Sequence, residues 1–310
     1  MSPPRSLQSP SAGALPASPV ARAPEQSRAG WRPQLVSLKR AVRPQHWLHF
    51  MVLPVASWDR AAPLGVSLTA LARGALICAA VLAFGYLINT ISDRDLDRDA
   101  RKNPLVGVAR PSALHYAVAS ALPLVALVTA WLSPTPVLYA TLTAISAGTL
   151  YSIGPRLKSL PGVGSLLNVG CFAPLLLLGL SSEAVPEARW LLVACFSLLL
   201  LQNQLIHEAA DADDDRGGGV RTTFQLLGAR ATALLIGALG LLLSGLSVEL
   251  LQRSAAPTWL AAYAAPFVLW FPWALARRAP HVSHAQALRV QHRVASAASC
   301  ALLLGCVLIW

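Results

Sequence analysis

Apolar runs separated by polar or proline-containing breaks recur along the whole chain. A helix needs about 20 apolar residues to cross the hydrocarbon core of a bilayer, and most of these runs come close to that length. Nine runs are expected to be spans, although the first is short and contains Pro54. They cover about residues 46–62, 67–90, 112–132, 135–152, 163–181, 189–208, 230–251, 257–276 and 289–310. The pattern therefore predicts an all-α integral membrane protein with about nine transmembrane helices.

The first segment of the chain has a different character. Residues 1–34 are rich in Pro, Ser, Ala and Arg, and they lack the apolar core of a signal peptide. We expect them to form a disordered basic tail, followed by a membrane domain over residues 35–310. The segment 31–42 combines apolar and basic positions, so a short interfacial helix is expected across this boundary.

Composition agrees with a membrane protein. Hydrophobic residues make up 55% of the chain and charged residues only 13%, whereas soluble domains average about 25% charged residues. All five cysteines lie inside apolar runs without paired spacing. They are therefore interpreted as small core residues and not as a disulfide framework or a metal site.

The basic residues predict the orientation of the spans. Of the 25 Lys and Arg residues, only Arg60, Arg73, Arg189 and Arg253 fall on the side opposite the N-terminus if there are nine spans. The positive-inside rule then makes the N-terminal side cytoplasmic and puts the C-terminus on the opposite side. Five tryptophans at the opposite ends of the spans fit an aromatic belt there: Trp58, Trp131, Trp190, Trp259 and Trp310. The loops at about 91–111, 153–162, 209–229 and 277–290 would face the cytoplasm.

Acidic residues concentrate in two of these cytoplasmic segments. The first segment, "NTISDRDLDRDA", follows the second span, and the second, "NQLIHEAADADDD", follows the sixth. In the first, Asn89, Asp93 and Asp97 are four residues apart, so a helix would carry them on one face. The second repeats the spacing with Asn203, His207, Asp211 and Asp215, with Glu208 beside the stripe.

Stacked carboxylates repel one another, so this arrangement calls for a cation. Oxygen ligands on two facing helices suit Mg²⁺, which commonly completes its coordination with water and substrate phosphate. The two clusters therefore predict a metal-bridged diphosphate. The alternative is that the acids are only solvated helix ends, which is the interpretation we favour for Asp95, Asp99 and Asp213. The sequence leaves the role of Asp214 open.

At these residues the sequence resembles the UbiA superfamily of intramembrane prenyltransferases. That family carries an NxxxDxxxD motif after its second span and a DxxxD motif after its sixth, which correspond here to Asn89–Asp93–Asp97 and Asp211–Asp215. The loop "LYSIGPRLKSLPG" (150–162) and the run "GVRTTFQLLG" (219–228) also resemble family signatures. The resemblance covers about residues 40–310, with departures at Thr90 and at Asn103–Pro104, where many members have Asp and an Arg–Pro pair.

This resemblance implies a helix bundle around a central cavity that opens to the cytoplasmic side. The reaction would be Mg²⁺-dependent transfer of a prenyl group from a prenyl diphosphate to a lipophilic or aromatic acceptor. Two Mg²⁺ ions would bridge the diphosphate, one held by Asp93 and Asp97 and the other by Asp211 and Asp215. Seven further residues would bind the diphosphate or assist catalysis: Asn89, Tyr151, Arg156 and Lys158, with Arg101, Lys102 and Arg221 as additional phosphate ligands. Arg156 and Lys158 could instead only obey the positive-inside rule.

Three residues have roles that the sequence leaves open. His207 could be a base or a group that supports the metal, but a hydrogen-bonded packing role is slightly favoured. Glu208 could be a direct or a more distant ligand, and Arg43 could lie at the acceptor entrance or only contact the membrane surface. The sequence does not identify the acceptor, the prenyl length or a protein partner, and nothing in it predicts nucleic-acid binding.

Three other classes of protein were compared with this interpretation. A transporter is disfavoured because its charges would lie near the middle of the membrane on broken helices, whereas these acids lie at helix ends. A transferase that uses phosphoribosyl diphosphate and a polyprenyl phosphate would contain the same Mg²⁺–diphosphate chemistry, and it is the main alternative. A membrane scaffold gives no reason for two matched ligand stripes.

Overall fold

The computed structural model describes residues 31–97, 100, 103–108, 110–154, 157–213, 221–277 and 282–309. Most of the predicted tail lies outside this range, as do Asp99, Arg101, Lys102, Arg156, Asp214, Asp215 and Trp310. The described part begins with helix α1 at Trp31, four residues inside the segment predicted to be a tail.

All the regular elements of the described residues are helices. The α-helices are α1 (Trp31–Val42), α2 (Leu64–Ser92), α3 (Ala113–Trp131), α4 (Thr135–Ser152), α5 (Val163–Phe172), α6 (Glu187–Ala210), α8 (Thr223–Arg253), α9 (Ala265–Val268), α10 (Trp270–Arg277) and α11 (Val282–Ile309). The 3₁₀ segments are η1 (Pro44–His46), η2 (Leu48–Ser57), η3 (Leu157–Ser159), η4 (Ala173–Leu177) and η5 (Thr258–Ala264).

Helical structure occurs at each of the nine predicted ranges, but the lengths differ. Among the described residues, six helical segments are long and apolar enough to cross a membrane. They are Leu64–Ser92, Ala113–Trp131, Glu187–Ala210, Thr223–Arg253, Thr258–Arg277 and His284–Ile309. Leu48–Ser57 and Val163–Leu177 are apolar but shorter. The structure therefore supports an all-helical integral membrane protein with six candidate spans.

Prolines account for the irregular segments. Pro54 lies inside η2, which is a 3₁₀ helix over its whole length. Pro266 and Pro272 lie in the predicted span 257–276, which is divided into η5, α9 and α10. Proline removes a backbone N–H and its ring collides with the preceding turn, so it kinks or breaks an α-helix; α3 nevertheless continues through Pro123.

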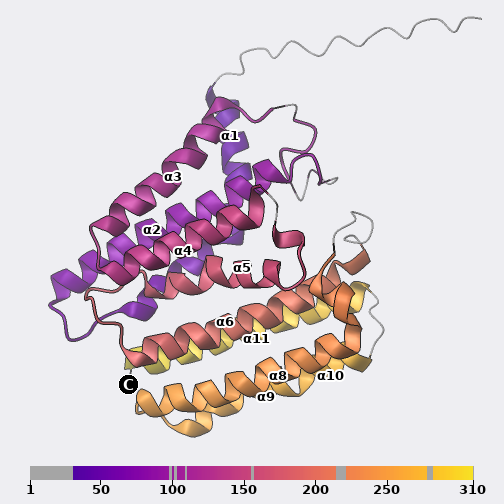
Figure 1. Ribbon diagram of the computed structural model, residues 1–310. Helices are drawn as coiled ribbons and strands as arrows, with labels where there is room; N and C mark the ends of the chain where they lie inside the picture. Colours follow the sequence, from indigo (N-terminus) through magenta and orange to yellow (C-terminus); the bar gives the residue numbers. More distant parts are fainter. Residues whose placement is uncertain are drawn as a thin grey trace, which may run out of the picture.

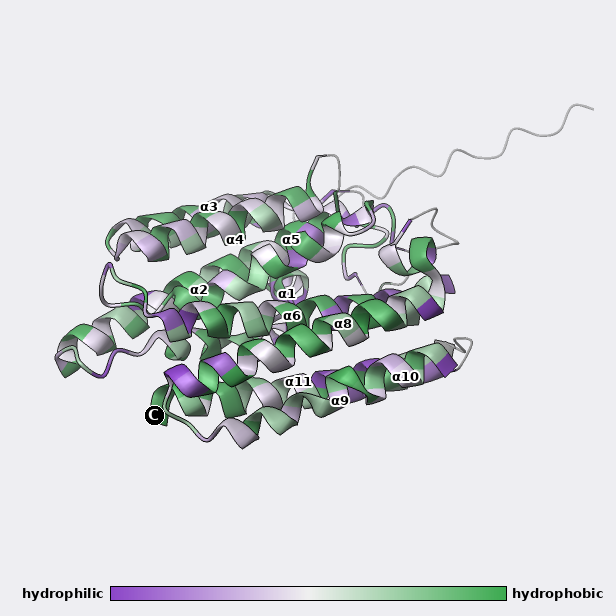
Figure 2. Cartoon of the chain, turned by 60° about the horizontal axis from the view of Figure 1, so that its bottom comes forward, coloured by the Kyte–Doolittle hydropathy of each residue, from purple (hydrophilic) through white to green (hydrophobic). Residues whose placement is uncertain are grey.

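The helices pack side by side in two groups that α5 and α6 connect (Figure 1). Helices α1 to α4 form one group and α8 to α11 the other, and α6 packs against α5, α8 and α11. Apolar residues dominate the middle of the long helices, and hydrophilic residues gather towards their ends (Figure 2). A large apolar core cluster runs through both groups.

Glycines permit close helix contacts, as small residues do in membrane bundles. A Cβ atom at Gly240 of α8 would lie 2.6 Å from the carbonyl oxygen of Phe267 in α9. At Gly74 of α2, a Cβ atom would collide with the carbonyl of Leu178, just after η4. Gly74 lies in the second predicted span and Gly240 in the seventh, so both spans use a glycine for close packing.

The two acid-bearing helices end on the same side of the bundle. Helices α2, α4 and α6 all run towards this end (Figure 1). Trp131, Trp190 and Trp259 are exposed where α3 ends and where α6 and η5 begin, which is the opposite end of the bundle in Figure 1. The fold therefore puts the two acidic helix ends opposite these three tryptophans.

Candidate functional site

The first acidic cluster lies where α2 ends. The helix stops at Ser92, and Asp93 caps it with its N–H bonded to the carbonyl of Asn89. Asp97 lies beyond the helix, and its backbone N–H donates to the carbonyl of Asp93 at 2.9 Å. The sequence predicted two helical turns through Asn89, Asp93 and Asp97. The structure has a helical turn from Asn89 to Asp93 and a non-helical turn from Asp93 to Asp97.

Lys158 of η3 lies against this cluster. Its Nζ is 3.0 Å from Asn89 Oδ1 and 2.5 Å from Asp93 Oδ2, and Asp93 is only 7% exposed. Asn89 and Lys158 are 69 residues apart in sequence, so the fold brings together two predicted site residues from distant motifs. The C-terminus of a helix carries partial negative charge, which disfavours a carboxylate there. The ammonium group compensates both the helix end and Asp93.

The end of α4 supplies a second part of the same site. The Nζ of Lys158 lies 5.5 Å from the centre of the Tyr151 ring, and Ser152 Oγ donates to Asn89 Oδ1 at 3.4 Å. Tyr151 also interacts electrostatically with Asp93 and with Glu208 of α6. This tyrosine therefore lies within electrostatic reach of the acidic ends of both α2 and α6.

Asn103 is a site residue that the sequence interpretation missed. Its side chain is 1% exposed, and its Nδ2 donates to Asp97 Oδ2 and to the carbonyl of Thr90, both at 2.9 Å. Its Oδ1 accepts the N–H of Leu105 at 3.0 Å. Asn103 thus fixes the turn that follows the acidic cluster and holds the Asp97 carboxylate. The sequence signal that could have identified Asn103 is the asparagine before Pro104, where the family commonly has arginine.

The second acidic cluster lies where α6 ends. The helix stops at Ala210, so Asp211 is its C-terminal cap. Asp211 Oδ2 is 2.9 Å from His207 Nδ1, and its Oδ1 is 3.8 Å from Arg289 Nη1 of α11. Asn203 Oδ1, two turns earlier, is buried and has no hydrogen-bond partner among the described residues. The predicted partner Asp215 lies outside the described residues.

Glu208 has a different environment from Asp211. It is 7% exposed, and its Oε1 accepts from Ser165 Oγ at 3.2 Å. Its Oε2 accepts the N–H of Phe224 at 3.0 Å. These bonds connect α5, α6 and the first turn of α8, where the orphan N–H groups of the helix favour a carboxylate. The geometry favours a structural role for Glu208.

Asp95 of the first cluster has the environment expected for a solvated acid. The Asp95 side chain is largely exposed and pairs with Arg94 at 2.8 Å. The hydrogen bond from Arg94 lowers the pKa of Asp95. Asp213 and the predicted phosphate ligand Arg221 are also exposed. These three positions are therefore accessible to solvent.

The donor set fits a hard divalent cation. Carboxylate and amide oxygens are the ligands that Mg²⁺ takes, and the Lys158 ammonium shows that Asn89 and Asp93 together hold a cation. Among the described residues, no three His, Cys, Asp or Glu side chains lie close enough together to bind a metal without further ligands. Substrate oxygens would have to complete the coordination.

A group of basic residues lies near Tyr86, which precedes Asn89 by about one turn of α2. Arg43 has a left-handed backbone (φ 52°), and its Nη2 is 3.5 Å from His46 Nε2. The His46 ring stacks on Tyr86, and Arg293 of α11 interacts electrostatically with both. Arg43 and Arg293 have no carboxylate partner among the described residues. Since Arg293 lies inside a candidate span, its charge is expected to face a polar site.

Comparisons with known proteins identify the family of the chain. The model of the UbiA prenyltransferase family matches residues 51–297. None of the curated proteins compared with the chain matches it significantly.

Solved structures share the fold. The structure of a UbiA homolog from Archaeoglobus fulgidus bound to GPP and Mg²⁺ has a TM-score of 0.65 at 21% identity, covering 87% of this chain and 99% of that one. A digeranylgeranylglyceryl phosphate synthase has a TM-score of 0.71 at 16% identity, covering 90% and 100%. A UbiA homolog from Aeropyrum pernix K1 has a TM-score of 0.57 at 20% identity, covering 86% and 98%.

Proposed function

Because the chain belongs to the UbiA prenyltransferase family and is a membrane enzyme of that class, we propose that it transfers a prenyl group from a prenyl diphosphate to a lipophilic or aromatic acceptor and releases diphosphate. The contact of Lys158 with Asn89 and Asp93 is the observation that carries this proposal. It joins an oxygen-rich cation site to a cationic group suited to phosphate, in one place at the end of α2.

The metal site would consist of both acidic helix ends. Asp93 and Asp97 would hold one Mg²⁺ ion, and Asp211 and Asp215 the other, with Asn89 as an additional oxygen ligand. When bound, Mg²⁺ supplies Lewis-acid stabilisation of the negative charge that develops on the leaving diphosphate. The hydrogen bond from Asn103 would keep the Asp97 carboxylate in position for this task.

Lys158 would bind the diphosphate directly. Its ammonium donates to Asn89 and Asp93 now, and it would turn to phosphate oxygens when the substrate arrives. The Tyr151 ring beside it would face the allylic carbon, whose positive charge grows as the bond to oxygen breaks. Arg101, Lys102, Arg156 and Arg221 would add positive charge around the diphosphate.

Arg43 and Arg293 favour an acceptor with an anionic group. They come from distant parts of the sequence, both interact electrostatically with His46 and Tyr86, and neither has a carboxylate partner among the described residues. Asp93 follows Tyr86 by seven residues, or about 10 Å along α2 at 1.5 Å per residue. A carboxylate or phosphate held at this distance would orient the reactive end of the acceptor towards the prenyl carbon.

The membrane arrangement is proposed from the sequence. Nine helical segments would cross the bilayer around a central cavity, with the N-terminus and the acidic helix ends on the cytoplasmic side. The separation of the acidic end from the tryptophan-bearing end supports this arrangement. Soluble Mg²⁺ and released diphosphate would then exchange with the cytoplasm.

The test is diphosphate release by the purified protein in liposomes with Mg²⁺. Geranyl, farnesyl and geranylgeranyl diphosphates would each be offered with pooled acceptors, and mass spectrometry would identify the product. Asp93→Asn and Asp211→Asn should abolish turnover, whereas the exposed Asp95→Asn should not. If turnover appeared only with phosphoribosyl diphosphate and a polyprenyl phosphate, the protein would be a phosphoribosyltransferase and the proposed prenyl donor would be wrong. Equal activity of all three variants would contradict the metal site.

A further inference from the structure

Helix α1 presents a surface that is both apolar and basic. Trp31, Leu35 and Val36 are 68%, 44% and 52% exposed. The basic residues Arg32, Lys39 and Arg40 are also exposed, and the helix contains no acidic residue. A short helix with this composition belongs at the boundary between headgroups and acyl chains.

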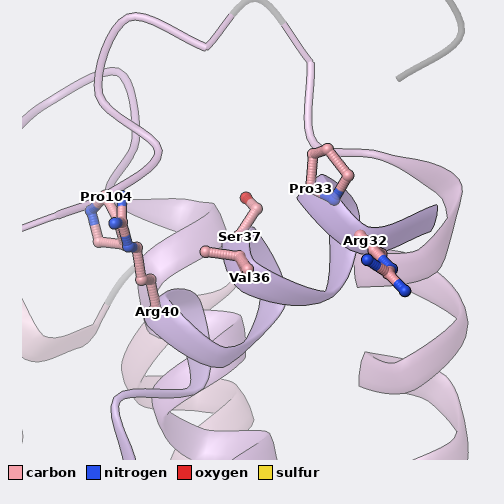
Figure 3. Close-up of a pocket in the computed structure, with 6 residues that line it drawn as sticks. All are labelled: Arg32, Pro33, Val36, Ser37, Arg40 and Pro104. Carbon is pink, nitrogen blue, oxygen red and sulfur yellow. The ribbon is translucent and has the colours of Figure 1, made fainter. Parts of the chain in front are cut away.

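A pocket of about 440 Å³ opens on this helix. It is lined by Arg32, Pro33, Val36, Ser37, Arg40 and Pro104. In Figure 3, Arg40 lies beside Pro104 at one side of the pocket and Arg32 is at the other, with Val36 and Ser37 between them. The lining therefore includes two arginines, a serine and apolar residues, and no acidic residue among those that the structure describes.

The walls of this pocket are fixed to the rest of the bundle. Thr90 Oγ1 of α2 donates to the carbonyl of Ala41 at 3.0 Å, and Ser37 Oγ lies 3.3 Å from His115 Nε2 of α3. Pro104 directly follows the buried Asn103. These bonds hold α1 against α2 and α3, and the wall at Pro104 belongs to a turn that Asn103 joins to Thr90 and Leu105 by hydrogen bonds.

We propose that this pocket binds the headgroup of an anionic phospholipid. The guanidinium groups of Arg32 and Arg40 suit the phosphate oxygens, to which arginine donates paired hydrogen bonds. Val36 and Pro33 would contact the glycerol region. The exposed side chains of Trp31 and Leu35 would meet the acyl chains, which a soluble phosphate does not have.

The two arginines are distinguished from Lys39, which is on the same helix but does not line the pocket. This gives a matched set of single variants, Arg32→Gln, Arg40→Gln and Lys39→Gln, each of which removes one positive charge. All three residues are exposed, so the variants should fold, and circular dichroism would check this.

The experiment measures the binding of phosphatidylglycerol to the full chain by native mass spectrometry, with phosphatidylcholine as the reference lipid. A basic residue near an anionic lipid surface strengthens binding about fivefold. We expect about that loss of phosphatidylglycerol affinity in Arg32→Gln and in Arg40→Gln, and little change in Lys39→Gln.

Three outcomes would overturn the proposal. The first is the same loss in Lys39→Gln as in the arginine variants, which would indicate a general effect of membrane charge. The second is equal affinity of the wild-type protein for the two lipids. The third is displacement of the lipid by millimolar glycerol 1-phosphate, which would show that the pocket takes phosphate without the lipid tail.

Discussion

At the scale of single residues, the site depends on side chains that hold charges in place. Asp93 and Asp211 both cap helix C-termini, where the backbone already carries negative charge. Each is compensated by a basic side chain from a distant segment, Lys158 for the first and Arg289 for the second. Neither partner could be assigned from the local sequence of the acidic motifs.

Lys158→Met should lower kcat/KM for the prenyl diphosphate by roughly 30- to 150-fold. A hydrogen bond to a charged group contributes about 2–3 kcal/mol when its loss leaves the partner buried, and Lys158 would contact both Asp93 and phosphate. Lys158→Arg should recover part of the activity. The measurement is steady-state diphosphate release, with Arg94→Gln as a control at a half-buried basic residue that pairs with the exposed Asp95. A Lys158→Met enzyme within twofold of wild type would contradict the role of Lys158.

Asn103→Ala should raise the Mg²⁺ concentration needed for half-maximal activity by about tenfold. The substitution frees the Asp97 carboxylate and leaves the carbonyl of Thr90 and the N–H of Leu105 without their bonds to Asn103, which costs about 1–3 kcal/mol for a buried group. A magnesium titration of activity, together with a melting curve, separates positioning from general destabilisation. A lower melting temperature with an unchanged Mg²⁺ requirement would show that Asn103 is only structural.

At the scale of elements, hydrophobic runs predicted where helices occur but not how they end. Each predicted range contains helix, because long apolar runs in lipid must satisfy their backbone groups internally. The i, i+4 spacing of the aspartates suggested continuous helix, yet α2 ends at Ser92 and α6 at Ala210. The turn after α2 keeps Asp97 close to Asp93 although it is not helical. Residue spacing alone does not distinguish such a turn from a helix. Asn103 was missed because its role requires the chain to fold back onto Asp97.

Helix packing in the second group can be tested with two glycines of α8. A methyl group at Gly240 would meet the carbonyl of Phe267 at 2.6 Å, whereas one at Gly245 would meet no atom within 4 Å. Gly240→Ala should lower stability by about 1–3 kcal/mol because the contact is overpacked. Gly245→Ala should be neutral or stabilising, since alanine favours helix. Thermal melting in detergent compares the two, and an equal effect on both would contradict the close contact of α8 and α9.

At the scale of the whole molecule, the fold brings residues from the two ends of the sequence together. Arg43 precedes η1, and Arg293 is in α11, the last helix, which contacts η2. The interaction of Arg293 with His46 and Tyr86 places the C-terminal helix next to the beginning of the membrane domain. The predicted span 289–310 already includes Arg293, and α11 begins earlier, at Val282.

Arg293→Gln should raise KM for the acceptor about tenfold or more and leave KM for the prenyl diphosphate nearly unchanged. The reason is that Arg293 is near His46 and Tyr86 and not at the end of α2. Arg277→Gln is a suitable control, because Arg277 lies over Trp273 at the end of α10. The kinetics require the acceptor identified by the product analysis. A change in prenyl diphosphate KM alone would move Arg293 to the donor site.

The position of Lys158 also has a thermodynamic consequence. Its ammonium group donates hydrogen bonds to the side-chain oxygens of Asn89 and Asp93. It must therefore leave these oxygens before they can bind a metal ion. Diphosphate gives the lysine a new set of oxygens to bind. Release of the lysine therefore links the two binding events, and linkage requires that each ligand raise the affinity of the other by the same factor. The enzyme should take up metal and diphosphate cooperatively, with little tendency to retain either one alone.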